Sequence, residues 1–176
     1  MTELEYKLNC ADDFDAYEAQ WFNTPKLRKD FDVYRISDCH VAKLVKGHDF
    51  WRRYDEETRK ARINYLINEC LLHNQAYQLG ISVPKPEGLF KVKIITEDSR
   101  ITAPAFVMEY VEGVNLFVLG ESSDDFDSAM TRRDEELEKA RDLGFIPQDF
   151  HCENTIWNPE RKKLYLIDLA KWRTKK

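Results

Sequence analysis

The stretch that decides the fold is GFIPQDFHCENTIWNPERKKLYLIDLAKW, which runs from Gly144 to Trp172. It holds Asp149 and Asn154 in a D-x-H-x-x-N arrangement, then the apolar segment TIW, the segment NPERKK, and a second apolar segment, KLYLID, that ends on Asp168. The Asn-Pro pair favours a turn, so the two apolar segments are predicted to be neighbouring strands. A tight strand pair would bring Asn154 close to Asp168.

These polar residues suggest a specific chemistry. An amide oxygen and a carboxylate are hard-oxygen ligands that suit Mg²⁺, which usually keeps waters and takes further ligands from phosphate. Asp149, in the loop before the first strand, is placed to accept a proton from a hydroxyl. Only the combination is informative, because an Asp followed five residues later by an Asn is common by chance.

The composition limits the class of protein. The chain has 176 residues, of which 43% are hydrophobic and 34% charged, which fits one globular domain or two small lobes. A net charge of -5 argues against a general nucleic-acid binder. No segment approaches the roughly 20 apolar residues of a membrane span. The acidic N-terminus lacks the apolar core of a signal peptide, and the four cysteines show no CxxC spacing, so we expect free thiols and a cytoplasmic protein.

The order of expected elements predicts an α+β fold. Helices are predicted over 12–22, 55–79 and 124–142, the last capped by Ser123 or Asp124. Strands are predicted over 31–37, 40–46, 89–96, 103–111, 155–157 and 163–168, with 97–101 as a loop. Hairpins dominate over long crossovers, which favours α+β over a doubly wound parallel sheet.

Two charged residues fall on apolar faces. On a helical projection of 55–79, Glu69 lies inside the broad apolar region, where a carboxylate is costly to bury unless a cation meets it. In the strand HVAKLVK, Lys43 shares a face with apolar residues. The alternatives are a solvated Glu69 at the edge of that region and a Lys43 that extends to water. The two are attractive as mutual partners.

Together these residues resemble the protein-kinase-like superfamily, in an atypical, minimal form similar to the RIO, Bud32-type and aminoglycoside-phosphotransferase-like kinases. VAK at Val41–Lys43 is similar to the third-strand lysine motif, and NECLLHNQAYQLGISVPKP to the glutamate-bearing helix and the loop after it. PAFVMEYVEGVNL resembles the strand and hinge that lead to the adenine pocket. QDFHCEN resembles the catalytic loop, and LIDLA stands where the family has Asp-Phe-Gly.

The resemblance covers most of the chain and implies its organisation. It implies a single kinase-like domain over 1–176, with an N-lobe to about residue 110 and a reduced C-lobe over about 111–176. The N-lobe would hold the N-terminal helix, an antiparallel sheet and one glutamate-bearing helix. The C-lobe would be strongly truncated and lack an activation segment, because only Leu169–Lys176 follow Asp168.

Carried over by position, the resemblance implies an ATP- and Mg²⁺-dependent phosphotransferase, whose chemistry is mostly positioning and charge neutralisation. Lys43 would hold the α- and β-phosphates, and Glu69 would hold Lys43. Asp149 would orient or deprotonate the acceptor hydroxyl. Asn154 and Asp168 would bind Mg²⁺.

The resemblance also implies nucleotide-binding positions in the hinge and the loop. Backbone groups from Glu109 to Val111 would meet the adenine edge, and Met108 would take a gatekeeper-like position. His151 matches the family histidine and would arrange the catalytic loop. One departure is that residues 25–43 contain no glycine, so the usual Gly-rich cover of the phosphates is absent or replaced by basic residues. The candidates for such a replacement are Lys26, Arg28 and Lys29.

These features favour a minimal Ser/Thr protein kinase. The alternatives are a weak or inactive pseudokinase that serves as a protein-binding module, and a small-molecule phosphotransferase. Since the usual platform for an acceptor is expected to be missing, we expect a protein substrate or a regulatory partner protein, and no nucleic acid. The basic tail KWRTKK is a further candidate for holding the substrate.

Overall fold

The computed structural model describes residues 31–35, 37–45, 55–96, 99–121 and 123–175. The predicted helix over 12–22 and the basic residues Lys26, Arg28 and Lys29 lie outside these ranges. The chain divides into two compact units, which are described separately. Unit 1 takes its described residues from Met1–Cys70 and Glu87–Tyr110, and unit 2 from Leu71–Pro86 and Val111–Lys176.

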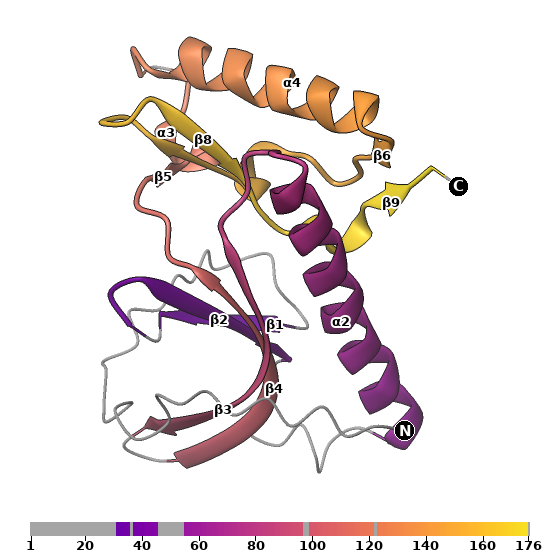
Figure 1. Cartoon of the computed structure of the whole chain (residues 1–176). Helices are drawn as coiled ribbons and strands as arrows, with labels where there is room; N and C mark the ends of the chain where they lie inside the picture. The colour runs from indigo at the N-terminus through magenta and orange to yellow at the C-terminus, as the bar shows by residue number, and fades with distance from the viewer. Residues whose placement is uncertain (1–30, 36, 46–54, 97–98, 122, 176) are drawn as a thin grey trace. The chain divides into compact units, whose positions relative to one another are not determined.

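Unit 1 contains a four-stranded sheet with the strand order β1-β2-β4-β3 (Figure 1). Its strands are β1 (Phe31–Arg35), β2 (His40–Val45), β3 (Pro86–Thr96) and β4 (Ser99–Glu109). The pairs β1–β2 and β2–β4 are antiparallel, and this register places Lys43 between Val33 and Phe106. Because Lys43 lies on the inner strand β2, its neighbours on both sides are strand residues.

Helix α2 (Glu56–Gln78) confirms the helix predicted over 55–79. Asp55 begins it as a side-chain cap: its Oδ1 accepts a hydrogen bond of 2.7 Å from the backbone N–H of Thr58. This bond is the main cause that lowers the pKa of the Asp55 carboxyl. Gly80 ends the helix with φ +77°, a left-handed conformation that glycine adopts without strain.

The strands of unit 1 differ from the prediction at their ends. β3 begins at Pro86 and not at residue 89, and β4 begins at Ser99, inside the predicted loop 97–101. β4 also ends at Glu109, before the predicted end at residue 111. A proline is tolerated at the first residue of a strand, and pairing between β3 and β4 extends the ladder beyond the apolar residues that marked the strands in the sequence.

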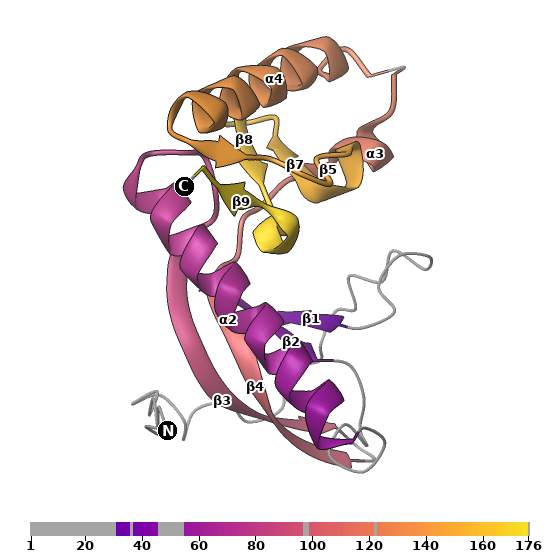
Figure 2. The same ribbon diagram turned by 90° about the vertical axis from the view of Figure 1, so that its right-hand side faces the viewer.

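Unit 2 contains small antiparallel sheets beside one long helix (Figure 2). One sheet has the order β5-β7-β8, and β6 pairs with β9 in another. The strands are β5 (Val114–Asn115), β6 (Phe145–Ile146), β7 (Thr155–Asn158), β8 (Lys163–Leu166) and β9 (Arg173–Thr174). The helices are α3 (Leu116–Leu119), α4 (Phe126–Asp142) and the short 3-10 turns η1 (Cys152–Asn154) and η2 (Leu169–Lys171).

The predicted cap of the second long helix is wrong. α4 begins at Phe126, and Asp125 precedes it without a side-chain hydrogen bond. Ser123 bonds to the residues just before and at the start of the helix: its backbone carbonyl accepts from the N–H of Phe126 at 2.9 Å, and its hydroxyl accepts from the N–H of Asp125 at 3.4 Å. The helix end at Asp142 agrees with the prediction.

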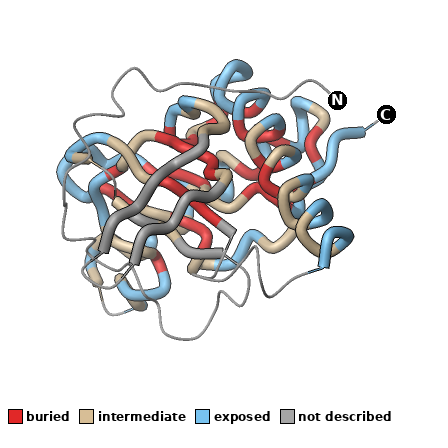
Figure 3. Tube along the Cα trace, turned by 90° about the horizontal axis from the view of Figure 1, so that it is seen from below, coloured by how far each residue is buried: buried red, intermediate tan, exposed pale blue. Residues whose placement is uncertain are grey.

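Each unit has its own hydrophobic cluster, and the buried residues are red in Figure 3. In unit 1, Leu66 of α2 packs with Phe106 and Met108 of β4. In unit 2, α4 packs on β8, and Trp157 of β7 is 1% exposed. The fold is therefore a mixture of helices and small, mainly antiparallel sheets, which confirms the predicted α+β class. Within the described ranges, no helix combines the length and the apolar character that crossing a membrane requires.

Candidate active site

In unit 1 the two charged residues that the sequence places on apolar faces form an ion pair. Lys43 Nζ lies 2.6 Å from Glu69 Oε2 and 2.8 Å from Glu69 Oε1, so the ammonium donates to both carboxylate oxygens. Lys43 is 2% exposed and Glu69 is 1% exposed. Tyr65, on the same helix as Glu69, has its ring centre 6.0 Å from Nζ. Neither charge reaches water. The alternatives of a solvated Glu69 and of a Lys43 that extends to water are therefore ruled out.

A gain in folding stability does not explain why Lys43 and Glu69 are buried as an ion pair. Removing two charges from water costs several kcal/mol for each ion, and the attraction between them roughly offsets that cost. An apolar pair of similar volume is often as stable or more stable. Two ions buried on an inner strand and its covering helix therefore point to a function that needs a fixed ammonium. A phosphate-binding role for Lys43 stays a prediction.

In unit 2 the predicted catalytic loop places Asp149 in a strained backbone conformation. Asp149 has φ +58°, which is uncommon for a residue other than glycine. Asn154 is 8% exposed and donates from Nδ2 to the backbone oxygen of Asp149 at 2.7 Å. This bond uses the amide nitrogen of Asn154 and leaves Oδ1 as the atom that can accept or coordinate.

Both carboxylate oxygens of Asp149 are also in contact with a side chain. His151 Nε2 lies 3.1 Å from Oδ1, and Lys171 Nζ lies 2.5 Å from Oδ2. His151 also meets Glu153, with Nδ1 3.5 Å from Oε2. The hydrogen bond to Asp149 raises the pKa of Lys171, so this ammonium stays charged at neutral pH. His151 is thus placed to arrange the loop, as the resemblance implies, although that role stays a prediction.

The β7–β8 hairpin brings Asn154 and Asp168 to the same end of two paired strands. Thr155 pairs with Leu166, and the N–H of Ile167 donates to the carbonyl of Asn154 at 2.9 Å. Asp168 follows with φ +61°, a second aspartate in the left-handed region. The neighbouring backbones of Asn154 and Asp168 follow from the strand pair that the sequence predicts.

The sequence predicts Asn154 and Asp168 as Mg²⁺ ligands. Among the residues that the structure describes, no group of three or more His, Cys, Asp and Glu side chains is arranged to hold a metal ion. Mg²⁺ is commonly bound through one or two protein oxygens, with phosphate and water completing its shell. Asn154 and Asp168 would supply one amide and one carboxylate, and Mg²⁺ binding by this pair stays a prediction.

The predicted hinge residues lie on both sides of the division between the units. Met108 is 8% exposed and packs against Leu66 and Phe106, and Glu109 ends β4. Unit 1 ends at Tyr110 and unit 2 resumes at Val111, a buried residue. Contacts of Met108, Glu109 and Val111 with an adenine ring stay predictions.

Two features of the site were not predicted from the sequence. Lys171 belongs to the turn η2, and nothing in its spacing indicates a contact with Asp149. Arg35 shapes the β1–β2 hairpin, which contains no glycine. Its guanidinium lies 4.1 Å from the ring centre of Tyr110, and its Nε donates to the carbonyl of Ser37 at 3.1 Å. A cation beside a turn is too common in sequences to have identified either residue.

Two cysteines, Cys70 of α2 and Cys152, lie next to predicted site residues. Burial raises the pKa of Cys70 to about 11, with a further contribution from Glu69, so this thiol is protonated at neutral pH. Cys152 of the catalytic loop is half-buried, and its Sγ lies 3.6 Å from Nη1 of Arg133. We assign neither cysteine a chemical role.

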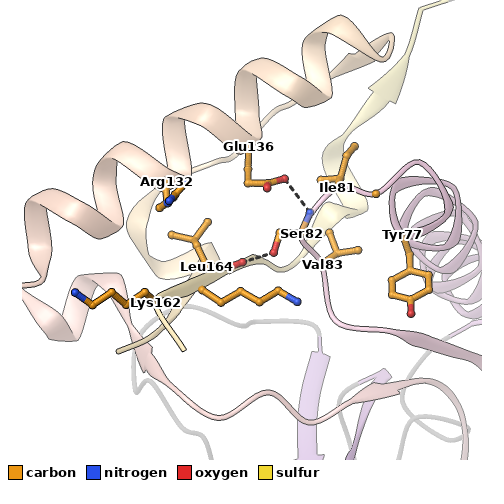
Figure 4. Close-up of a pocket in the computed structure, with 10 residues that line it drawn as sticks. Tyr77, Ile81, Ser82, Val83, Arg132, Glu136, Lys162 and Leu164 are labelled. Atoms are coloured by element: carbon orange, nitrogen blue, oxygen red, sulfur yellow. Dashed lines mark hydrogen bonds between the residues drawn. The ribbon is translucent and has the colours of Figure 1, made fainter. Parts of the chain in front are cut away.

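A pocket of about 400 Å³ lies elsewhere in unit 2 (Figure 4). It is bounded by the loop after α2, helix α4 and the turn between β7 and β8. Ser82 organises it: the N–H of Ser82 donates to Glu136 at 2.9 Å, and its hydroxyl donates to the carbonyl of Leu164. None of the predicted site residues lines this pocket, so it is separate from the catalytic loop.

Comparison with known proteins shows a likeness of fold. No model of a known protein family matches the chain, and no curated protein sequence matches it significantly. Crystal structures of the protein WbdD match the chain in fold. One has 16% sequence identity and a TM-score of 0.61, covering 89% of this chain and 33% of WbdD. A structure described as the bifunctional kinase-methyltransferase WbdD has 15% identity and a TM-score of 0.59, covering 84% and 31%.

A third structure, of WbdD with a kinase inhibitor, has 16% identity and a TM-score of 0.57, and covers 85% of this chain and 32% of WbdD. The chain thus spans about a third of the length of the WbdD chains that it matches. At this level of identity the likeness concerns the fold alone. It supports a kinase-like fold for the chain, in agreement with the resemblance found in the sequence.

Proposed function

We propose that the protein is an ATP- and Mg²⁺-dependent phosphotransferase that acts on a hydroxyl group, as a minimal Ser/Thr protein kinase. The observation that carries this proposal is the buried pair of Lys43 and Glu69, 2.6 Å apart at its shorter contact. Phosphoryl transfer needs a cation held at a fixed position beside phosphate oxygens, and a buried carboxylate holds an ammonium in that way. The kinase-like fold also supports a phosphate-binding role for Lys43.

The residues of unit 2 would supply the remaining functions. Asp149 would orient the acceptor hydroxyl and take its proton, while the acceptor oxygen bonds to the γ-phosphorus and the bond from that phosphorus to the leaving ADP oxygen breaks. Asn154 and Asp168 would hold Mg²⁺. When bound, that ion would neutralise charge on the phosphates. Lys43 of unit 1 would bind the α- and β-phosphates of ATP.

The proposal is tested by measuring ADP formation by the purified protein, with Mg²⁺ and with excess chelator. We expect turnover with Mg²⁺ that is lost with chelator and lost in Asp168→Asn. Asparagine tolerates a positive φ nearly as well as aspartate, so this change removes a charge and leaves the backbone in place. Asp142→Asn, at the exposed end of α4, is the matched control and should retain the wild-type rate.

The outcomes separate the candidate functions. Turnover that Asp168→Asn does not change would contradict the metal assignment. Nucleotide-dependent stabilisation without turnover would favour the non-catalytic binding module, because binding alone adds about 2.7 kcal/mol of stability at a ligand concentration 100-fold above Kd. Phosphorylation of small hydroxyl compounds but not of proteins would favour the small-molecule phosphotransferase.

A further inference from the structure

Asp149 is held at three points, which is more than its place in a surface loop requires. Asn154 binds its backbone oxygen at 2.7 Å, and His151 and Lys171 contact the two carboxylate oxygens at 3.1 and 2.5 Å. Its φ of +58° costs free energy unless surrounding contacts hold it in place. Contacts to both its backbone and its side chain therefore hold the carboxylate of Asp149 in one direction.

Lys171 connects the two loops of unit 2 that carry the proposed chemistry. It follows Asp168 by three residues, in η2, and its ammonium contacts Asp149, which lies in the loop before η1. The contact therefore links the segment with the proposed base to the segment with the proposed metal ligand. Asn154 already joins these segments through the bond between its carbonyl and Ile167 at 2.9 Å. The ammonium adds a link between side chains.

The contact contributes little to folding. The side chain of Lys171 is 57% exposed and that of Asp149 is 30% exposed. Ion pairs between exposed groups typically add less than about 1 kcal/mol, since water screens them and both side chains lose rotational freedom. A purely structural reason for this short contact is therefore weak.

From this geometry we infer that Lys171 is a positioning residue: it fixes the Asp149 carboxylate and sets its direction relative to Asp168. The inference rests on the proposed function, and it assigns a role to a residue outside the motifs that the sequence resemblance identified. Lys171 acts through Asp149. His151 contacts the opposite oxygen, so loss of Lys171 leaves the carboxylate held by a side chain at one oxygen only and less firmly fixed in direction.

The test compares Lys171→Met, Lys171→Arg and the control Lys60→Met in steady-state ATP turnover. Lys60 is an exposed lysine of α2 whose Nζ lies 2.7 Å from Glu56, so it too takes part in an exposed ion pair, outside the catalytic loop. We expect Lys171→Met to lower kcat by about 10- to 100-fold with little change in KM for ATP, because misplacing a catalytic group reduces the rate of the chemical step. Lys171→Arg should recover most of the rate, and Lys60→Met should match the wild type.

A double-variant cycle with Asp149→Asn separates positioning from other roles. If Lys171 acts through Asp149, then Lys171→Met lowers the rate in the wild type but causes no further loss in the Asp149→Asn background. An equal loss in both backgrounds would overturn the inference, because Lys171 would then act without Asp149. A wild-type rate in Lys171→Met would also overturn it and leave the proposed function standing, whereas absence of turnover in the wild type would overturn both.

Melting temperatures of the same proteins exclude a structural explanation. We expect Lys171→Met and Lys60→Met to unfold close to the wild-type temperature, since both side chains are exposed. A loss of rate in Lys171→Met accompanied by an equal loss of folded protein would contradict the positioning role.

Discussion

Replacing Lys43 by methionine is expected to lower the free energy of unfolding by about 3–5 kcal/mol, because it leaves the carboxylate of Glu69 buried without its cation. Glu69 is 1% exposed, so water does not take the place of the lost ammonium. Urea unfolding measures the change. The matched control is Lys60→Met on the same helix, where Lys60 Nζ lies 2.7 Å from Glu56 with 64% and 74% of the side chains exposed. That change should cost less than about 1 kcal/mol.

The double variant Lys43→Met/Glu69→Leu separates stability from function. With both charges replaced by apolar groups, we expect a stability within about 1 kcal/mol of the wild type or above it. Turnover of ATP should nevertheless be lost. A stable double variant that is as active as the wild type would show that the pair is not part of the site. A single Lys43→Met variant as stable as the Lys60→Met control would show that the pair is not closed in solution.

Replacing Asp149 by asparagine is expected to lower turnover by about 10²- to 10⁴-fold, the usual contribution of a general base. Asparagine has the same size and also tolerates the φ of +58° at this position. Binding of the nucleotide should change little, because Asp149 acts on the acceptor and not on the phosphates. Steady-state kinetics should therefore show a reduced kcat with an unchanged KM for ATP.

Two results would contradict that assignment. One is a variant with the wild-type kcat, which would remove Asp149 from the chemistry. The other is an equal loss of kcat and of folded protein in a circular-dichroism melt, which would make the aspartate a structural residue. The Asp142→Asn variant serves again as the control for an exposed carboxylate.

The elements with strong local signals could be predicted from the sequence. Helix α2 begins after a capping aspartate and ends before Gly80, so local rules determine both ends. The turn residues of NPERKK fix the hairpin that aligns Asn154 with Ile167. Glu69 on an apolar helix face and Lys43 on a strand face are unusual enough to be noticed, and the structure joins them.

Other features depend on contacts between distant parts of the chain and could not be predicted. The starts of β3 and β4 lie before the apolar segments that mark these strands in the sequence, where only pairing with a neighbouring strand continues the ladder. β5 and α3 have two and four residues, too few to show a periodic pattern. Lys171 reaches Asp149 only because η2 turns the chain after Asp168.

The most direct test of the central claim is calorimetric titration of MgATP into the wild type and into two variants, one altered in each unit. These are Lys43→Met/Glu69→Leu in unit 1 and Asp168→Asn in unit 2. We expect that the wild type binds one nucleotide per chain and that each variant, although folded, binds at least about 10-fold more weakly, because each loses charge–phosphate or metal contacts worth more than about 1.4 kcal/mol. Equal binding by all three proteins would contradict this expectation.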